Sequence, residues 1–149
     1  MKWAALIAWV ATAGGGFVLF SIWLLRGGLR QRERGRIRPP LIVSHFLLAA
    51  TGLVLWIVYL VNDSRTLSWV AFAILALVAL LGFTMLAIWI PQYQQRQRHG
   101  QPIAAGGAGD EPVVPAEQHF PVPIVVLHGL LAATTLVLVL LTALEVGTS

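Results

Sequence analysis

The sequence predicts an all-α membrane protein, a four-transmembrane-helix bundle made of two tandem parallel two-helix repeats. Two observations lead to this prediction. Hydrophobic residues make up 58% of the 149 residues and charged residues only 11%, which is too little polar surface for a water-soluble globule. The apolar residues also fall into four long blocks, and two of these blocks share one motif. We therefore treat residues 1–149 as a single transmembrane domain.

Each apolar block is long enough to cross a bilayer. The blocks cover residues 3–25, 41–61, 67–90 and 122–144, and none contains Asp, Glu, Lys or Arg. About 20 helical residues span a hydrocarbon core about 30 Å thick. Backbone groups in lipid must be paired within their own segment, so each block is predicted to be a helix. The first block extends beyond the length of a signal-peptide core, and we expect it to be retained.

Positive charge is concentrated in the first connection. Its basic residues are Arg26, Arg30, Arg32, Arg34, Arg36 and Arg38, with Glu33 as the only acid. Because cytoplasmic segments carry the excess of Lys and Arg, we expect loops 26–40 and 91–121 in the cytoplasm and both termini outside. The 91–121 loop is rich in Gln, Gly and Pro and is predicted to be a flexible tether. Arginine far exceeds lysine, which hints at a GC-rich bacterium and hence a bacterial plasma membrane.

The second and fourth blocks contain the same motif. Residues 40–51 align without gaps with residues 123–134, and a proline, a histidine and a threonine fall in register. Leu and Val matches carry little weight in such a composition, but these three do. The first and third blocks share a Gly-Phe pair and a Trp at the same spacing, at 16, 17 and 23 and at 82, 83 and 89. The repeat makes the second and fourth helices parallel.

His45 and His128 are equivalent in this repeat. Each lies five residues after the matched proline, about 8 Å along its helix, and so at similar depth in the inner leaflet. Ionisable residues within a membrane span are costly and usually face the bundle interior, which makes these two candidates for a functional site. Small residues follow on the same helical faces, and they leave room for a flat ligand or for close helix packing. These are Ala49 and Gly52 after His45, and Ala132 and Thr135 after His128.

Two histidines that face each other across a bundle can supply the axial ligands of a b-type haem. His45 and His128 are therefore candidate haem ligands, and candidate metal ligands only for haem iron, because two imidazoles are an incomplete set for zinc. Arg36 and Arg38 are candidate partners for the haem propionates. The arrangement resembles, in architecture alone, that of membrane cytochromes b. The alternative is that each histidine hydrogen-bonds a neighbouring helix and no cofactor is bound.

Three functions follow as hypotheses. The first is an accessory subunit or assembly component of a larger membrane complex, such as a respiratory one, with other membrane subunits as partners. The alternative is a bis-histidine haem b electron-transfer protein. A small transporter ranks third, because the intramembrane acids that couple protons or cations are missing. No catalytic motif is present, so we expect no independent enzyme activity. The expected surroundings are the lipid bilayer, with anionic lipid at the Arg-rich loop, and no nucleic acid.

Overall fold

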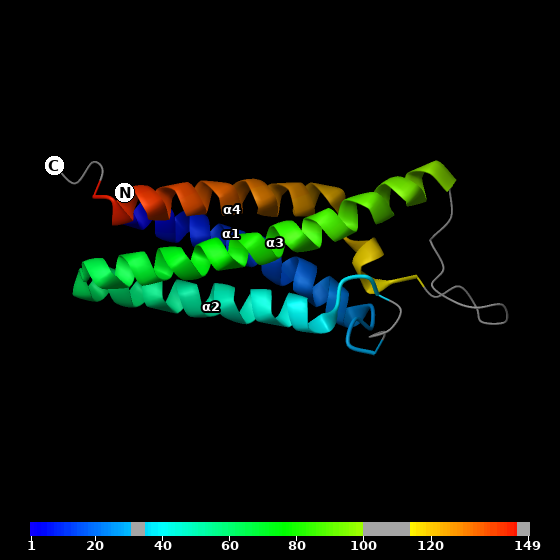
Figure 1. The fold of residues 1–149 in the computed structure, drawn as a ribbon, viewed down its shortest axis with the longest axis horizontal. Coiled ribbons are helices and arrows are strands. Elements are labelled where there is room, and N and C mark those ends of the chain that lie inside the picture. Colours follow the sequence, from blue (N-terminus) through cyan, green and yellow to red (C-terminus); the bar gives the residue numbers. More distant parts are fainter. Residues whose placement is uncertain (31–34, 100–113, 146–149) are drawn as a thin grey trace.

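A computed structural model describes residues 1–30, 35–99 and 114–145 of the chain. Its four long helices form an elongated bundle (Figure 1), and each is long and apolar enough to cross a membrane. They are α1 (Lys2–Leu25), α2 (Pro39–Asn62), α3 (Arg65–His99) and α4 (Val122–Ala143), with a short 3₁₀ helix, η1 (Ala116–His119), before α4. The prediction of an all-helical chain with four apolar helices is confirmed.

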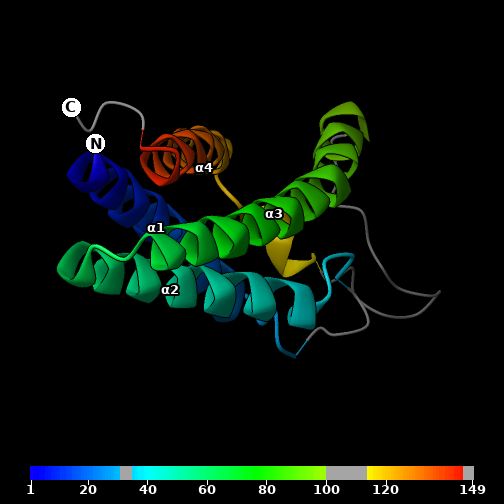
Figure 2. The same cartoon turned by 60° about the vertical axis from the view of Figure 1, so that its left-hand side comes forward.

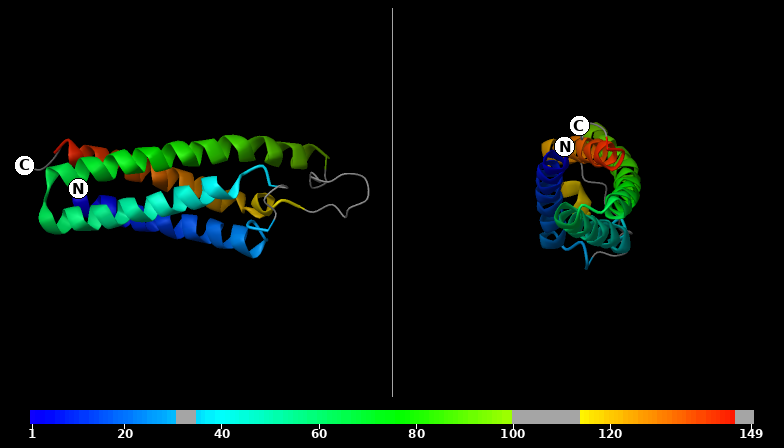
Figure 3. Two further views of the ribbon diagram at one scale, coloured as in Figure 1. Left: turned by 60° about the horizontal axis from the view of Figure 1, so that its bottom comes forward. Right: turned by 90° about the vertical axis from the view of Figure 1, so that its left-hand side faces the viewer.

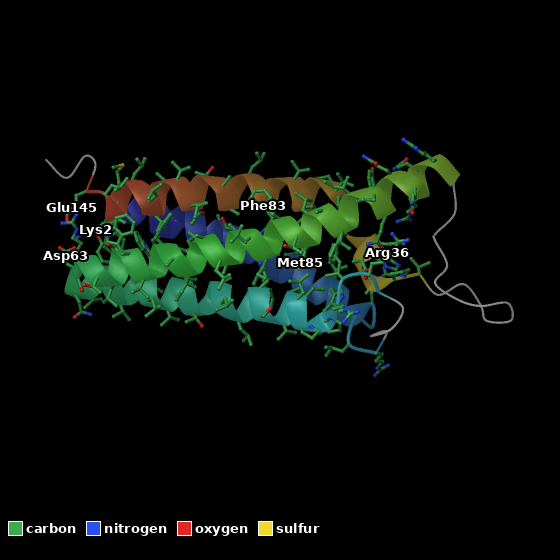
Figure 4. All side chains as sticks on the ribbon, in the orientation of Figure 1. Lys2, Arg36, Asp63, Phe83, Met85 and Glu145 are labelled. Atoms are coloured by element: carbon green, nitrogen blue, oxygen red, sulfur yellow. The ribbon has the colours of Figure 1, made fainter. Side chains whose placement is uncertain are left out.

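The helices form a closed ring, which the right-hand view of Figure 3 shows along the bundle axis. α1 packs mainly against α4 and α2 against α3, while the α1–α2 and α3–α4 contacts complete the ring. Lys2, Asp63 and Glu145 gather at one end, called here the Lys2 end (Figure 4). The opposite end, which carries the α1–α2 connection and η1, is called the Arg36 end. α2 and α4 therefore start at the same end, as the parallel arrangement requires.

The end of α1 is set by two glycines. Gly27 adopts the left-handed conformation with φ 80°, and its N–H donates to the carbonyl of Leu24 at 3.0 Å. The N–H of Gly28 donates to the carbonyl of Trp23 at 2.9 Å. These two bonds form a Schellman motif, which satisfies the last carbonyls of a helix and needs a residue that tolerates positive φ. The chain thereby leaves α1 with its terminal carbonyls paired.

α3 is longer than its apolar block. It continues past Pro91 to His99 and projects beyond the rest of the bundle (Figures 1 and 2). Residues 91–99 and the helix η1 belong to the segment that the sequence assigns to one loop, and residues 100–113 lie outside the described residues. The extension is rich in Gln and Arg, which are good helix formers, so the helix continues after the hydropathy signal has ended.

The core consists of two clusters that lie one above the other along the bundle. The cluster nearer the Lys2 end is built around Trp9, Trp56 and Tyr59, and the one nearer the Arg36 end around Trp23 and Trp89. His45 and His128 belong to neither buried cluster. Along α2, the position of His45 falls between Ile42 of one cluster and Trp56 of the other. The histidines therefore lie at the junction between the two packed layers.

Two acids fasten the Lys2 end. Asp63 follows α2 and Glu145 follows α4, and both take left-handed backbone conformations, with φ 51° and 59°. Asp63 pairs with Lys2 at 2.8 Å and Glu145 with Arg65 at 3.5 Å, so each acid joins the end of one helix to the start of another. Such exposed pairs contribute little to stability, because water screens their charges. They orient the helix ends more than they stabilise the fold.

Candidate functional site

The structure brings His45 and His128 together inside the bundle. Their rings come from α2 and α4, with ring centres 6.4 Å apart and ring planes inclined by 66°. Both rings are only partly buried, so the packing around them is not closed. A pair of imidazoles at one height is the geometry that the repeated motif predicts.

One nitrogen of each ring is held by a neighbouring helix. Nδ1 of His45 lies 3.0 Å from the carbonyl oxygen of Val78 on α3, and Nδ1 of His128 lies 2.9 Å from that of Thr12 on α1. A carbonyl oxygen can only accept, so each Nδ1 carries the proton and donates it. In the neutral ring, Nε2 then keeps its lone pair. Within residues 1–30, 35–99 and 114–145, neither Nε2 takes part in a hydrogen bond.

Both rings rest against a glycine. A Cβ atom at Gly16 would lie 2.9 Å from Cε1 of His128, and one at Gly82 would lie 3.3 Å from Cε1 of His45. Gly16 and Gly82 each lie four residues after the carbonyl that accepts the Nδ1 proton, one helical turn further along. Each histidine therefore sits against one turn of a neighbouring helix, with a carbonyl at one side and a glycine at the other.

Gly16→Ala is expected to disturb the packing of the His128 ring against α1. The new methyl group would be closer to Cε1 than real Cβ atoms come to their neighbours, and overpacking of this kind costs roughly 1–3 kcal/mol. The matched control is Gly14→Ala, because a Cβ there meets no atom within 4 Å. Unfolding in detergent by SDS titration, followed by circular dichroism, measures the difference. Equal stability of the two variants would contradict the assigned contact.

On the Lys2 side of the histidines, the small residues that follow them on the same helices serve close packing. A Cβ at Gly52 would lie 2.9 Å from the ring of Trp9 and 3.2 Å from Ile74, so this glycine makes space for a tryptophan. The equivalent residue of α4, Thr135, is fully buried, and its Oγ1 lies 3.0 Å from Oγ1 of Thr12. The interior on the Lys2 side of the histidines is therefore filled.

The structure does not bring Arg36 and Arg38 to the histidines. Both side chains are exposed and line a hollow of about 830 Å³ at the Arg36 end. Val43 also lines this hollow, and it precedes His45 by two residues, or about 200° around the helix. The hollow therefore lies on the outer side of α2, and a role for these arginines at haem propionates stays a prediction.

Glu117 is a buried carboxylate that sequence reasoning missed. It is 1% exposed, and its Oε1 accepts hydrogen bonds from the backbone N–H groups of Arg36 at 2.8 Å and Ile37 at 3.4 Å. Its backbone carbonyl accepts the indole N–H of Trp89 at 3.0 Å. Glu117 thus ties the α1–α2 connection to α3. Its only sequence signal is that it is the last acid before the fourth apolar block.

Among the described residues, the histidine pair is not part of a larger set of metal ligands. In the part of the chain that the structure describes, no group of three or more His, Asp or Glu could hold a metal ion. Two imidazoles are nevertheless the full protein ligand set of a bis-histidine haem, because the macrocycle supplies the other four donors. Comparison of the chain with protein-family models, curated proteins and solved structures finds no match.

Proposed function

We propose that this chain is a four-span membrane protein that holds one b-type haem between His45 and His128 and transfers single electrons. The outer surface of the bundle supports the membrane setting. Large apolar side chains are exposed along it, among them Ile7, Phe83 and Leu130, each between 64% and 70% exposed. In water such a surface costs about 25 cal/mol per Å² of apolar area, whereas in lipid it does not. The Arg-rich end then faces the cytoplasm of a bacterium and the Lys2 end faces outward.

The single observation that carries the haem proposal is the state of the imidazole nitrogens. Histidines that bind a metal almost always donate their other N–H to a backbone carbonyl, a carboxylate or water, which fixes the tautomer and raises ligand basicity. His45 and His128 both do so, through Val78 and Thr12. Two Nε2 lone pairs without hydrogen bonds, at one level in an apolar interior, suit a shared electrophile.

The ring separation fits a shared iron atom. A metal–imidazole bond is about 2.0 Å long, and bonds of about 1.33 Å place each ring atom about 1.1 Å from the ring centre. Two imidazoles that held one metal ion between them would have centres about 6 Å apart, and the observed distance between the ring centres is 6.4 Å. Gly16 and Gly82 present no side chain, which leaves space for the rings of His128 and His45 beside α1 and α3.

The residues around the histidine pair have different roles in this proposal. Haem supplies one-electron chemistry when bound, at a potential set by its ligands and its surroundings. His45 and His128 hold it, and the carbonyls of Val78 and Thr12 orient the two rings. Trp9 and Trp56 fill the bundle on the Lys2 side, so one chain offers one site.

The two helix pairs are related by duplication in this proposal. Supporting it, the acceptors Thr12 and Val78 occupy the same position relative to Gly16 and Gly82 as the sequence repeat requires. Each pair also ends its second helix with an acid in the left-handed conformation, although Asp63 and Glu145 differ by one position in the register of the repeat. Independent origins of the two pairs would give no reason for such agreement.

A role as an accessory subunit is the second candidate function. The observation that favours it is the projecting part of α3, whose residues 94–98 are all exposed (Figure 1). Within this part of α3, Arg96 donates from Nη1 to the carbonyl of Gln118 in η1 at 2.8 Å, while the helix continues past its own bundle. This end of α3 is the surface that a larger membrane complex would contact, and a haem-bearing subunit could use it as well.

The experiment that tests the haem proposal is spectroscopy of the purified chain. Protein made in haem-supplied cells and extracted in mild detergent should contain one haem per chain. Resonance Raman and electron paramagnetic resonance spectra should report a six-coordinate, low-spin iron that is reduced reversibly. A chain that stays colourless, and that binds no hemin on titration, would leave the accessory subunit as the function.

A further inference from the structure

We infer that the hollow beside Arg36 and Arg38 binds the headgroup of an anionic phospholipid, in a site whose shape Glu117 maintains. The inference rests on the membrane setting of the proposed function and is independent of haem. The hollow combines two guanidinium groups with the apolar side chains of Leu29, Pro39, Pro40 and Val43. Within the described parts of the chain, neither Arg36 nor Arg38 forms an ion pair with a carboxylate.

The position of the hollow suits a lipid. It lies at the first turn of α2 on the outer side of the helix, where an acyl chain in the bilayer would pass. Val43 lines the hollow, and Leu47, one turn further along the same face, is 57% exposed. Val54, two turns beyond Leu47, is exposed as well. A headgroup phosphate at the arginines would therefore continue into an acyl chain that lies against the apolar outer face of α2.

The backbone under the two arginines is fixed. Ile37 is 3% exposed and packs into the core cluster that contains Trp23 and Trp89. Glu117 accepts the N–H groups of Arg36 and Ile37 through Oε1. With Ile37 held inside, Arg36 and Arg38 project outward on either side of it. The backbone that carries the two cations is thus held in place before a ligand arrives, which distinguishes this hollow from charge on an unanchored loop.

Guanidinium groups favour a phosphate diester as the occupant. Each offers a planar fork of N–H donors that matches two phosphate oxygens, and two such groups on one anion outcompete the weak attraction of scattered surface charge. A zwitterionic lipid adds an ammonium group next to the phosphate, which the two arginines would repel. We therefore commit to an anionic phospholipid, with phosphatidylglycerol as the probe.

The test measures binding of labelled phosphatidylglycerol to the full chain in phosphatidylcholine nanodiscs. Arg36→Gln with Arg38→Gln should weaken binding about tenfold, as expected for loss of charge-assisted hydrogen bonds to phosphate. The matched control, Arg30→Gln with Arg98→Gln, removes the same charge at the same end but outside the hollow, and should change binding less than about threefold. Equal losses in the two double variants would overturn the site and indicate diffuse attraction alone.

Glu117 provides a test of opposite sign. Glu117→Ala removes a negative charge beside the hollow, so diffuse electrostatics predicts tighter binding of an anionic lipid. A built site predicts weaker binding, because the backbone of Arg36 and Ile37 loses its acceptor. Glu117→Gln keeps an oxygen acceptor and should restore binding, and unfolding midpoints of both variants identify any general loss of fold. Tighter binding by folded Glu117→Ala would overturn the inference. Because no haem is needed, its failure would leave the haem proposal untouched.

Discussion

Substitution of His45 or His128 by alanine is expected to abolish the six-coordinate haem spectrum of the chain. The rings are 6.4 Å apart and come from different helices, so either substitution removes one axial ligand and leaves the other in place. The remaining histidine would hold a five-coordinate iron with greatly weakened affinity. Haem content per chain, with resonance Raman spectra of whatever remains bound, measures the effect.

Two further variants separate ligation from folding. His119→Ala removes a histidine at the Arg36 end, in η1, and should leave the spectrum unchanged. His45→Gly should regain a low-spin spectrum when imidazole is added, because the free base can occupy the vacated position. If His45→Ala and His128→Ala retain the wild-type spectrum, or if neither wild type nor variant binds haem, the two histidines serve helix packing.

Gly28→Ala is expected to cause the largest loss of stability among single substitutions outside the histidine pair. A Cβ at this position would overlap the indole ring of Trp23. Trp23 is 1% exposed and belongs to the core cluster at the Arg36 end, so the ring has no free space to enter. Overpacking of a rigid core side chain costs roughly 1–3 kcal/mol and occasionally more, and the Schellman bond from Gly28 to Trp23 would be strained as well.

The unfolding midpoint in detergent measures this effect, with Gly14→Ala again as the matched control. Ala is the better helix former by about 1 kcal/mol, so the control should be at least as stable as the wild type. A double variant adds a sharper test: Trp23→Leu should relieve the overlap, so that Gly28→Ala costs less in its presence. Full additivity of the two substitutions would show that the side chain of Trp23 is not the obstacle.

The sequence predicted the helices well because long apolar runs of this kind leave few choices. Long runs without charge can only be helical in a bilayer, and their ends coincide with charge and proline. The end of α3 was not foreseen, since hydropathy reports the apolar block and is silent about a polar helix that follows it. The level of the two histidines could be predicted, because one gapless motif places both at the same distance from a proline.

The partners of the histidines could not be predicted. Every residue carries a backbone carbonyl, so nothing in the sequence marks Val78 or Thr12 as an acceptor. Gly52 illustrates a second limit, because a small residue predicts either space or close packing, and here Trp9 decides the matter. Glu117 illustrates a third, since its contacts with Arg36 and Ile37 join segments about 80 positions apart.

The hydrogen bonds of the two histidines cross between the helix pairs. His45 belongs to the first pair and its acceptor, Val78, to the second, while His128 belongs to the second and its acceptor, Thr12, to the first. One helix pair alone therefore supplies an imidazole but not the carbonyl that accepts its proton. Two identical copies around a twofold axis would supply both. An ancestral two-helix homodimer would already contain the paired arrangement. Under the proposed duplication, fusion into a single chain would allow what such a dimer forbids, namely unlike packing at equivalent positions, as Gly52 against Trp9 and Thr135 against Thr12 illustrate.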